Sequence, residues 1–498
     1  MVDKKIFINA EDQEELRIAI TEDATLQGFQ IERASNESYL GNIYKGVVTN
    51  VEPSIGAAFV DFGGDRNGFL HVSDVLPIYR QNNPLVDDPN VRKREHQNIQ
   101  EYLAKDQEVL VQITKDGIGK KGPTLTTYLS IPGRYLVLMP SLSRSGVSKK
   151  IEDRDERVRL KRILGKVDPP PGMGYIIRTA GVGQDVSDII RDLEYLLKLW
   201  NTITKRVKSE KAPAAIYQES DAVIRTIRDQ FTPDVSEILI DSELIYRKAQ
   251  DFVRTVLPSC VDRVKLYTDP QPLLHKMKLE DEIERLFHRK VNLKSGGSIV
   301  IDQTEALVAI DVNSGKNREQ EDLEETAFST NKEALEEIAR QIRLRDLGGV
   351  IINDFIDMQD ERHKREVERL FKDAFRRDKV RMKIARISHF GMIEMTRQRV
   401  GQSLYRNNST PCPHCRGAGF VRNVDAIGLK ILREVTNIFA LNKARRVQVK
   451  CASRVADFLK RNKRDRIDRL ERHYERPIVI VSESGTGIEE FEIKRFDS

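Results

Sequence analysis

The sequence predicts a multidomain α/β protein into which a small β-barrel is inserted. In several parts of the chain, apolar runs of strand length alternate with amphipathic helical stretches, as in sheets that are covered by helices. Between residues 38 and 128 the pattern changes to short β-rich runs separated by glycine turns, which is typical of a small barrel. The length of 498 residues is sufficient for several domains.

The composition indicates a globular protein without membrane spans. Charged residues make up 32% of the chain and hydrophobic residues 39%. No apolar run approaches the roughly 18 residues that a membrane-spanning helix needs. The first residues, MVDKKIFINAEDQEELR, are too acidic and too short in their apolar part for a signal peptide, so we expect a cytoplasmic protein.

The net charge of +6, from 83 basic and 77 acidic residues, is modest, but basic residues cluster locally. One cluster lies in residues 205–211 and another in a helix-like stretch, residues 454–476. Each cluster alone is equally consistent with an ordinary solvated surface. Together with the candidate metal site in residues 287–405, which would act on phosphate, the two clusters favour a polyanionic partner.

Residues 1–128 predict an α/β unit and then the barrel. Three strand-like runs, KKIFINA, EELRIAITED and LQGFQIER, occupy residues 1–37. The barrel pattern fits an OB-fold, in which Phe59 and Phe69 lie near glycine-rich turns. These rings either belong to the barrel core, which the pattern alone slightly favours, or stack on bases.

Residues 129–286 contain a candidate anion pocket. The strand-like run YIIRTAGVG places Arg178 and Thr179 before a turn of small residues, where guanidinium and backbone N–H groups can surround an anion. Alternatively, Arg178 only anchors the turn. A mixed α/β pattern returns at residues 222–286, and apolar spacing predicts a helix over residues 281–293.

Two carboxylates mark a candidate metal site in residues 287–405. Asp311 closes the apolar run ALVAID, and Asp354 closes GVIIND. If these strands are neighbours, both side chains emerge at one edge of the sheet, and Asn313 points to the same side as Asp311. Magnesium prefers such oxygen ligands, whereas the structural alternative is that these residues cap turns.

The elements around these carboxylates complete an α/β sheet. A helix is predicted over residues 322–345, ending before Gly348 and Gly349, and a second amphipathic helix over residues 361–378. Residues 380–388 predict a further strand. Phosphate-directed sites in such folds lie at the carboxyl ends of strands, where Asp311 and Asp354 fall.

The four cysteines include one close pair, Cys412 and Cys415, in the stretch TPCPHCRGAGF. A structural zinc needs four ligands, and the sequence has no second pair of this kind. The pair is a redox pair, a site without metal, or half of a zinc site shared between two chains. A shared zinc would require a symmetric dimer.

Several long motifs resemble the ribonuclease E/G family of bacterial endoribonucleases. They are IDQTEALVAIDVNSGK, DLEETAFSTNKEALEEIARQIRLRDLGG, DFIDM, HFGMIEMTRQR and CPHCRGAG. The likeness covers nearly the whole chain and corresponds to ribonuclease G or to a catalytic half without the degradosome scaffold. It implies ribonuclease H-like and deoxyribonuclease-like α/β subdomains, an inserted OB-fold barrel and a small C-terminal α/β domain.

The resemblance divides the chain into seven segments. They are 1–37, ribonuclease H-like, first part; 38–128, the OB-fold RNA-binding domain; 129–221, the sensor of the 5′-phosphate; 222–286, ribonuclease H-like, second part; 287–405, the catalytic metal-binding subdomain; 406–419, the zinc link; and 420–498, the small C-terminal domain.

The resemblance also implies roles for particular residues. Asp311 and Asp354 would hold magnesium, supported by Asn313, and Phe59, Phe69 and Lys121 would grip RNA. The pocket for a 5′-monophosphate would include Gly133, Val137, Arg178, Thr179 and Arg381. Cys412 and Cys415 would share zinc with a second subunit, and dimers would pair into homotetramers. Asn353 departs from the family pattern, which has an apolar residue before the metal-binding Asp.

We therefore expect a magnesium-dependent endoribonuclease that cuts single-stranded RNA in mRNA decay and rRNA processing. A 5′-monophosphate would stimulate it, and cleavage would leave 3′-hydroxyl and 5′-phosphate ends. The first alternative is a non-catalytic RNA-binding protein of ribosome assembly, and the second is a metal-dependent DNA nuclease.

Overall fold

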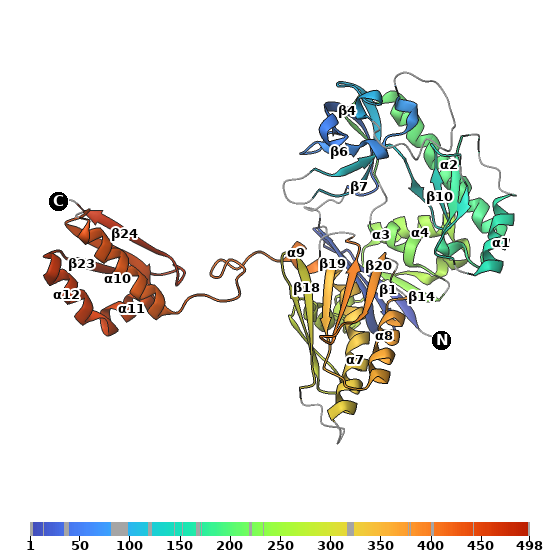
Figure 1. Cartoon of the computed structure of the whole chain (residues 1–498). Helices are drawn as coiled ribbons and strands as arrows, with labels where there is room; N and C mark the ends of the chain where they lie inside the picture. The colour runs from blue at the N-terminus through green and yellow to red at the C-terminus, as the bar shows by residue number, and fades with distance from the viewer. Residues whose placement is uncertain are drawn as a thin grey trace. The chain divides into compact units, whose positions relative to one another are not determined.

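The protein consists of two compact units, Met1–Tyr405 and Arg406–Ser498. The computed structural model describes residues 3–12, 14–33, 39–80, 98–117, 122–143, 145–151, 153–165, 170, 172–218, 222–232, 234–315, 323–376, 378, 380–399, 403–441 and 443–496. Figure 1 shows the course of the chain. No helix within these ranges has the length and apolar character that crossing a membrane would require.

The first sheet joins the beginning of the chain to a segment about halfway along it. Its strand order is β15-β14-β1-β2-β3, and β1 runs parallel to β14 and antiparallel to β2. The strands are β1 (Lys4–Asn9), β2 (Glu15–Glu22), β3 (Thr25–Arg33), β14 (Val235–Ile240) and β15 (Val264–Leu266). Apolar residues of α3 (Ala222–Gln230) and α4 (Glu243–Val256) pack on it, together with α5 (Leu273–Lys276) and α6 (Glu280–Arg285). The strands expected in residues 1–37 are confirmed.

The predicted helix over residues 281–293 is wrong in its second half. The helix α6 ends at Arg285, and β16 (Lys290–Asn292) is an edge strand that pairs with β17. Val291 lies opposite Ile299 in this pairing. A hairpin ladder with the next strand along the chain overrides the helical spacing here, since such spacing is only a weak guide.

The inserted barrel is confirmed. Five strands follow one another in the order β4-β5-β6-β8-β7, and pairing of β4 with β7 closes the ring. They are β4 (Ile43–Glu52), β5 (Ala57–Asp61), β6 (Gly68–His71), β7 (Glu108–Lys115) and β8 (Thr124–Thr126), and β13 (Ala214–Tyr217) adds to the outside of β4. A closed barrel of this size is the OB-fold architecture.

A separate small sheet carries the candidate anion pocket. Its order is β11-β12-β10-β9, with β9 (Ile131–Pro132), β10 (Leu136–Met139), β11 (Gly146–Val147) and β12 (Gly174–Ile177). The helices α1 (Arg154–Leu164) and α2 (Val186–Ser209) share its hydrophobic core.

The sheet with the paired carboxylates has the order β16-β17-β18-β19-β21-β20. Its remaining strands are β17 (Ser298–Gln303), β18 (Leu307–Asn313), β19 (Gly349–Asp354), β20 (Met382–Ile387) and β21 (Met392–Arg397). The helices α7 (Leu323–Leu344) and α8 (Glu361–Ala374) cover one face, and α9 (Leu404–Asn408) follows. The predicted helices and the strand at 380–388 are confirmed, although α8 ends earlier than expected.

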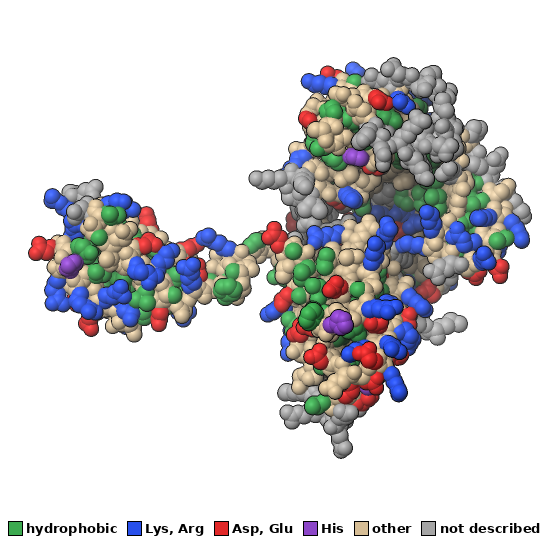
Figure 2. Space-filling model, viewed as in Figure 1, with side chains coloured by type: hydrophobic (Ala, Val, Ile, Leu, Met, Phe, Trp, Pro, Cys, Tyr) green, Lys and Arg blue, Asp and Glu red, His purple; other side chains and the backbone are tan. Residues whose placement is uncertain are grey.

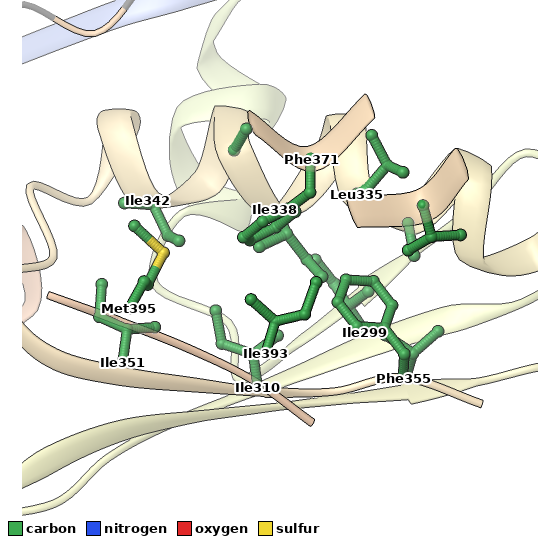
Figure 3. Packing of buried hydrophobic residues seen from close by; sticks show 14 of the residues in the cluster. Ile299, Ile310, Leu335, Ile338, Ile342, Ile351, Phe355, Phe371, Ile393 and Met395 are labelled. Atoms are coloured by element: carbon green, nitrogen blue, oxygen red, sulfur yellow. The ribbon is translucent and has the colours of Figure 1, made fainter. Parts of the chain in front are cut away.

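The core between this sheet and its helices is aliphatic and aromatic. Figure 3 shows Ile338 of α7 and Phe371 of α8 directed toward Ile310 and Ile393 of the sheet. Alternation along each strand therefore sends every second residue to the opposite face. Among those residues, Val350 and Glu394 are exposed to solvent.

The C-terminal unit is a small α/β domain with the strand order β23-β22-β24. Its elements are α10 (Val424–Ala440), β22 (Arg446–Ala452), α11 (Ser453–Asn462), α12 (Arg464–Tyr474), β23 (Ile478–Glu483) and β24 (Phe491–Phe496). The basic stretch at residues 454–476 is thus two helices that meet at Lys463, not one.

Candidate functional site

Asp311 and Asp354 lie directly opposite each other on neighbouring parallel strands. The strands β18 and β19 pair in register, with Asp311 as the partner of Asp354 at the end of the ladder. Both side chains are exposed, and Asn313 is exposed on the same face of β18. The expected meeting of the two carboxylates at one sheet edge is therefore found, and their role in metal binding stays a prediction.

Burial of the alternate residues fixes the direction of these side chains. Val308, Ile310 and Val312 of β18 are buried in the core under the helices. Since side chains alternate along a strand, Asp311 and Asn313 must point to the opposite face. A register slip of one residue would bury both polar side chains, so the core enforces the geometry of the site.

The negative charges of the carboxylate pair repel each other. Burial, followed by the charges of Asp311 and Asp357, raises the pKa of Asp354 above its ordinary value. The Asn313 side-chain amide donates a hydrogen bond of 2.7 Å to Asp311 Oδ2. A bound cation would relieve this repulsion, since an opposite charge favours the ionised carboxylate.

The donor set suits magnesium better than a transition metal. The parts of the chain that the structure describes contain no group of three or more His, Cys, Asp or Glu side chains arranged around a metal position. Magnesium needs only one or two protein carboxylates, because it keeps several of its waters. Asp311 and Asp354 therefore fit this ion through oxygen ligands alone.

Asn353, the residue that departs from the family pattern, points into the core. It is 0% exposed, and its Nδ2 donates to the backbone oxygen of Ile393 at 3.1 Å. Its Oδ1 is buried without a hydrogen-bond partner among the described residues. The departure therefore affects packing below the sheet, on the face opposite to the carboxylates.

The hairpin between β20 and β21 is a part of this edge that the sequence analysis did not single out. Met392 pairs with Asp354, so the turn before Met392 lies beside the carboxylates. A Cβ at Gly391 would lie 2.9 Å from Asp357 Oδ1. The available signal was the motif HFGM, which directly follows the strand predicted at residues 380–388.

Arg178 lies between β12 and the turn that begins at Thr179, and its role in an anion pocket stays a prediction. Its Nη1 donates to the Gly133 carbonyl oxygen at 2.5 Å, and its Nη2 lies 2.6 Å from Asp229 Oδ1. Burial opposes ionisation of Asp229, but hydrogen bonds and charges from Arg228 and Arg178 lower its pKa overall. Asp229 was not expected from the sequence, because it lies on α3, in a different segment.

A buried carboxylate, Asp192, accepts hydrogen bonds from the loop that follows Gly133. Asp192 of α2 accepts hydrogen bonds from the backbone N–H groups of Arg134, Tyr135 and Leu136, at 3.0, 2.7 and 2.9 Å. Burial raises the pKa of Asp192, against these hydrogen bonds. A Cβ at Gly133 would lie 2.6 Å from Asp192 Oδ2, so this position requires glycine.

Of the other residues expected in this pocket, Thr179 and Val137 lie near Arg178 at the small sheet, whereas Arg381 lies beside a different sheet. Thr179 is exposed at the start of the turn after Arg178, and Val137 of β10 is half-buried opposite Ile176. Arg381 is exposed just before β20, on the sheet of the carboxylates. Within the described ranges its side chain makes no hydrogen bond or ion pair that would connect it to Arg178 or Gly133.

Phe59 and Phe69 form an aromatic pair on the outside of the barrel. They are register partners on β5 and β6, with ring centroids 6.0 Å apart at an interplanar angle of 70°. Both rings are half-buried and lie outside the barrel's buried core cluster. The core position that the sequence pattern slightly favoured is therefore wrong, and contact of the rings with bases stays a prediction. Lys121 lies outside the described residues.

Cys412 and Cys415 lie in the segment that precedes the C-terminal domain. Cys412 is exposed and Cys415 is half-buried, and neither forms a disulfide. Hydrogen bonds from the backbone N–H groups of Gly419 and Gly417 lower the pKa of the Cys415 thiol, against a smaller effect of burial. Thiolates stabilised in this way are suitable zinc ligands.

The two basic clusters are largely exposed. Arg206, at the end of α2, donates to the backbone oxygen of Ala215 at 2.9 Å. On α11 and α12, Lys460, Arg461 and Arg466 are exposed, and Arg464 pairs with Asp468 at 2.9 Å.

Three family models match the chain. The model of the ribonuclease E/G family matches residues 130–400. The model described as an S1 RNA binding domain matches residues 39–116, which contain the barrel. The model described as the thioredoxin-like domain of RNase E/G matches residues 411–496.

Curated proteins with similar sequences carry two names. Ribonuclease E of Haemophilus influenzae is 43% identical over 99% of this chain, and ribonuclease E of Escherichia coli K12 is 43% identical over 94%. The matches span 52% and 44% of those proteins, so the chain covers about half of their length. Ribonuclease G of Escherichia coli K12 is 36% identical over 96% of this chain and 97% of that protein.

Proposed function

Because this chain belongs to the ribonuclease E/G family, we propose that it is an endoribonuclease that cuts single-stranded RNA with a magnesium ion held by Asp311 and Asp354. The observation that carries this proposal is the pairing of the two carboxylates in register on β18 and β19. Their exposure on one face leaves room for a phosphate group beside them.

Magnesium, when bound, would activate a water molecule and neutralise charge on the scissile phosphate. Asp311 and Asp354 would hold the ion and orient it toward the RNA. Asn313 would keep Asp311 in place through their hydrogen bond of 2.7 Å. In-line attack of water would leave a 3′-hydroxyl and a 5′-phosphate, and no side chain is required as a base.

The aromatic pair on the barrel would bind the RNA strand. Phe59 and Phe69 present half-buried rings beside Thr49 and Asn67, whose side chains form a hydrogen bond of 3.0 Å. Rings stack on bases of any identity, because every base has a π-face. Lys121 is proposed as a third contact on the basis of the resemblance.

We also propose that a 5′-monophosphate stimulates cleavage through the Arg178 pocket. Gly133 and Asp229 hold two of the guanidinium nitrogens, which supports a preorganised pocket. Arg is suited to a terminal phosphate, because its planar fork makes paired, charge-assisted hydrogen bonds. Val137 and Thr179 would line this pocket, and Arg381 would reach it when RNA binds.

We also propose an assembly and a cellular role on the basis of the family resemblance. Cys412 and Cys415 would share zinc with a second subunit, and the dimers would pair into tetramers. The ribonuclease H-like and deoxyribonuclease-like subdomains remain proposals for the sheets with β1 and β18. The expected setting is the cytoplasm, where the protein would act in mRNA decay and rRNA processing.

One digestion tests the proposed activity. A labelled single-stranded RNA and a DNA of the same sequence are incubated with the protein in magnesium and in excess chelator. We expect RNA cleavage in magnesium, no cleavage in chelator, and little cleavage of DNA. RNA that is bound but stays intact would favour the non-catalytic RNA-binding alternative, and equal cutting of DNA would favour a general nuclease.

A further inference from the structure

The turn between β20 and β21 presents an aromatic ring to solvent. Phe390 is 79% exposed, whereas the phenylalanines of the core beneath the same sheet, Phe355, Phe371 and Phe375, are buried. An exposed phenyl ring forgoes the stabilisation that burial of its apolar surface would provide. The exposed ring is an apolar surface that a ligand can cover.

The conformation of the turn is tightly defined. The Ser388 N–H donates to the Met392 carbonyl at 2.9 Å, and the Gly391 N–H donates to the Ser388 carbonyl at 3.0 Å. Gly391 has a φ of 79°, and a Cβ there would lie 2.9 Å from Asp357 Oδ1. Glycine is therefore required beside Phe390, and the turn is closely packed against the segment that follows Asp354.

The ring is close to the paired carboxylates. Met392, two residues after Phe390, is the register partner of Asp354, which in turn pairs with Asp311. Because two residues of chain span at most about 7 Å, the backbone of Phe390 lies within that distance of Met392.

Basic side chains lie on β20 and in the turn, beside the acidic edge formed by Asp354 and Asp357. Lys383, Arg386 and His389 are exposed on β20 and in the turn. Figure 2 shows Lys and Arg side chains gathering over the part of the molecule where Figure 1 places β20 and α8. Cations that attract phosphates, next to a ring that can stack, form the usual surface for single-stranded nucleic acid.

We propose that Phe390 stacks on one base of the single-stranded RNA next to the cleaved bond and thereby positions the scissile phosphate over Asp311 and Asp354. This inference rests on the proposed function and adds a base-binding position at the catalytic edge. It is distinct from Phe59 and Phe69, which belong to the barrel. A second copy of the chain covering the ring is the competing occupant.

The test uses an RNA with one cleavage site and a 5′-hydroxyl, in which an abasic nucleotide replaces each position around the cleaved bond in turn. For the wild type, we expect one abasic position to lower kcat/KM by at least about fivefold, the lower end of the effect of one stacked base. Phe390→Ala should lower cleavage of the intact RNA by a similar factor. It should cause no further loss on that one abasic RNA, and Phe390→Trp should retain activity.

A matched control is Leu244→Ala on α4, which removes another exposed apolar side chain (66% exposed) from the same unit. It should cut every substrate like the wild type. The proposal is overturned if Phe390→Ala cuts intact RNA at the wild-type rate, or if it loses the same factor on every abasic RNA. Equal loss together with a smaller oligomer in sedimentation would assign the ring to a subunit contact instead.

A binding measurement separates this proposal from the nuclease activity. RNA with 2-aminopurine at the same positions should show fluorescence quenching at one position with the wild type and not with Phe390→Ala. Quenching by a wild type that does not cut would support stacking and refute the nuclease function. Cleavage without any Phe390-dependent position would refute stacking and leave the nuclease function standing.

Discussion

Arg178 and Asp229 form an ion pair of 2.6 Å between the turn after β12 and the helix α3. Both side chains are about one-quarter to one-third exposed, at 27% and 30%. Because Gly133 accepts a second hydrogen bond from the same guanidinium, Arg178 is held in one orientation with donors remaining. This arrangement is compatible with an anchor for the turn and with a receptor for a terminal phosphate.

Arg178→Gln distinguishes these two roles. We predict that the wild type prefers 5′-monophosphate RNA over 5′-hydroxyl RNA, and that the variant loses this preference. A charge-assisted contact of about 1.5–3 kcal/mol corresponds to roughly tenfold to a hundredfold in rate. Cleavage of 5′-hydroxyl RNA should stay nearly intact.

The measurement compares kcat/KM on two RNAs that differ only in their 5′ end. Arg191→Gln serves as the control, since Arg191 pairs with Asp188 on the nearby helix α2. Equal loss on both RNAs, with a lower melting temperature, would mean that Arg178 holds the fold.

The aromatic pair on the barrel predicts a loss of RNA affinity. Phe59→Ala and Phe69→Ala should each weaken binding of single-stranded RNA by about 1–3 kcal/mol, the range for one stacked base. Because both rings lie outside the buried core cluster, the melting temperature should change little. Ile78→Ala, on the barrel and 84% exposed, should leave the affinity unchanged. Unfolding of either phenylalanine variant would indicate a structural role.

The cysteine pair predicts a metal-linked assembly. If two chains share one zinc, elemental analysis should find about half an ion per chain, because two thiolates from each chain complete four ligands. Cys412→Ser combined with Cys415→Ser should abolish zinc binding and shift the oligomer to a smaller species in sedimentation. Cys260→Ser is the control. One full zinc per monomer, or an unchanged oligomer without zinc, would contradict this model.

We predict that replacing Asn353 with leucine stabilises the protein. Its buried Oδ1 has no partner in the described structure, and such a group costs about 1–3 kcal/mol. Asn353→Leu keeps a similar volume while losing one hydrogen bond to Ile393. We expect the free energy of unfolding to rise by about 1 kcal/mol in urea titrations, with cleavage unaffected. A clear loss of stability would mean that the hydrogen bond to Ile393 contributes more than burial of the unpaired Oδ1 costs.

The sequence was most informative where chemistry follows local patterns. Asp311 and Asp354 each close an apolar run, so their meeting at one edge needed only that β18 and β19 be neighbours. The barrel was recognisable from its short runs and glycine turns. In contrast, the partnership of Arg178 with Asp229 depends on how two separate segments dock, and no spacing in the chain encodes it.

Where the predictions from sequence were wrong or incomplete, the outcome depended on strand pairing or solvent exposure, which local patterns do not encode. Val291 follows a helical spacing, but its backbone completes a hairpin ladder with the next strand, β17, and this pairing prevails. The rings of Phe59 and Phe69 resemble core residues in the strand pattern, and only their exposure separates a stacking surface from a barrel interior. Phe390 lies in a short turn, whose importance depends on the register between β19 and β21.

The central claim is that Asp311 and Asp354 hold the metal ion that cuts RNA. The most direct test measures single-turnover cleavage of one single-stranded RNA by the wild type, Asp311→Asn and Asp354→Asn over a range of magnesium concentrations. Asp302→Asn, which removes a carboxylate paired with Arg289 on the same sheet, is the matched control. We predict that each metal-site variant loses at least roughly a hundredfold, or about 2.7 kcal/mol of barrier, while RNA affinity is largely kept. Wild-type cleavage by either variant at limiting magnesium would contradict the claim.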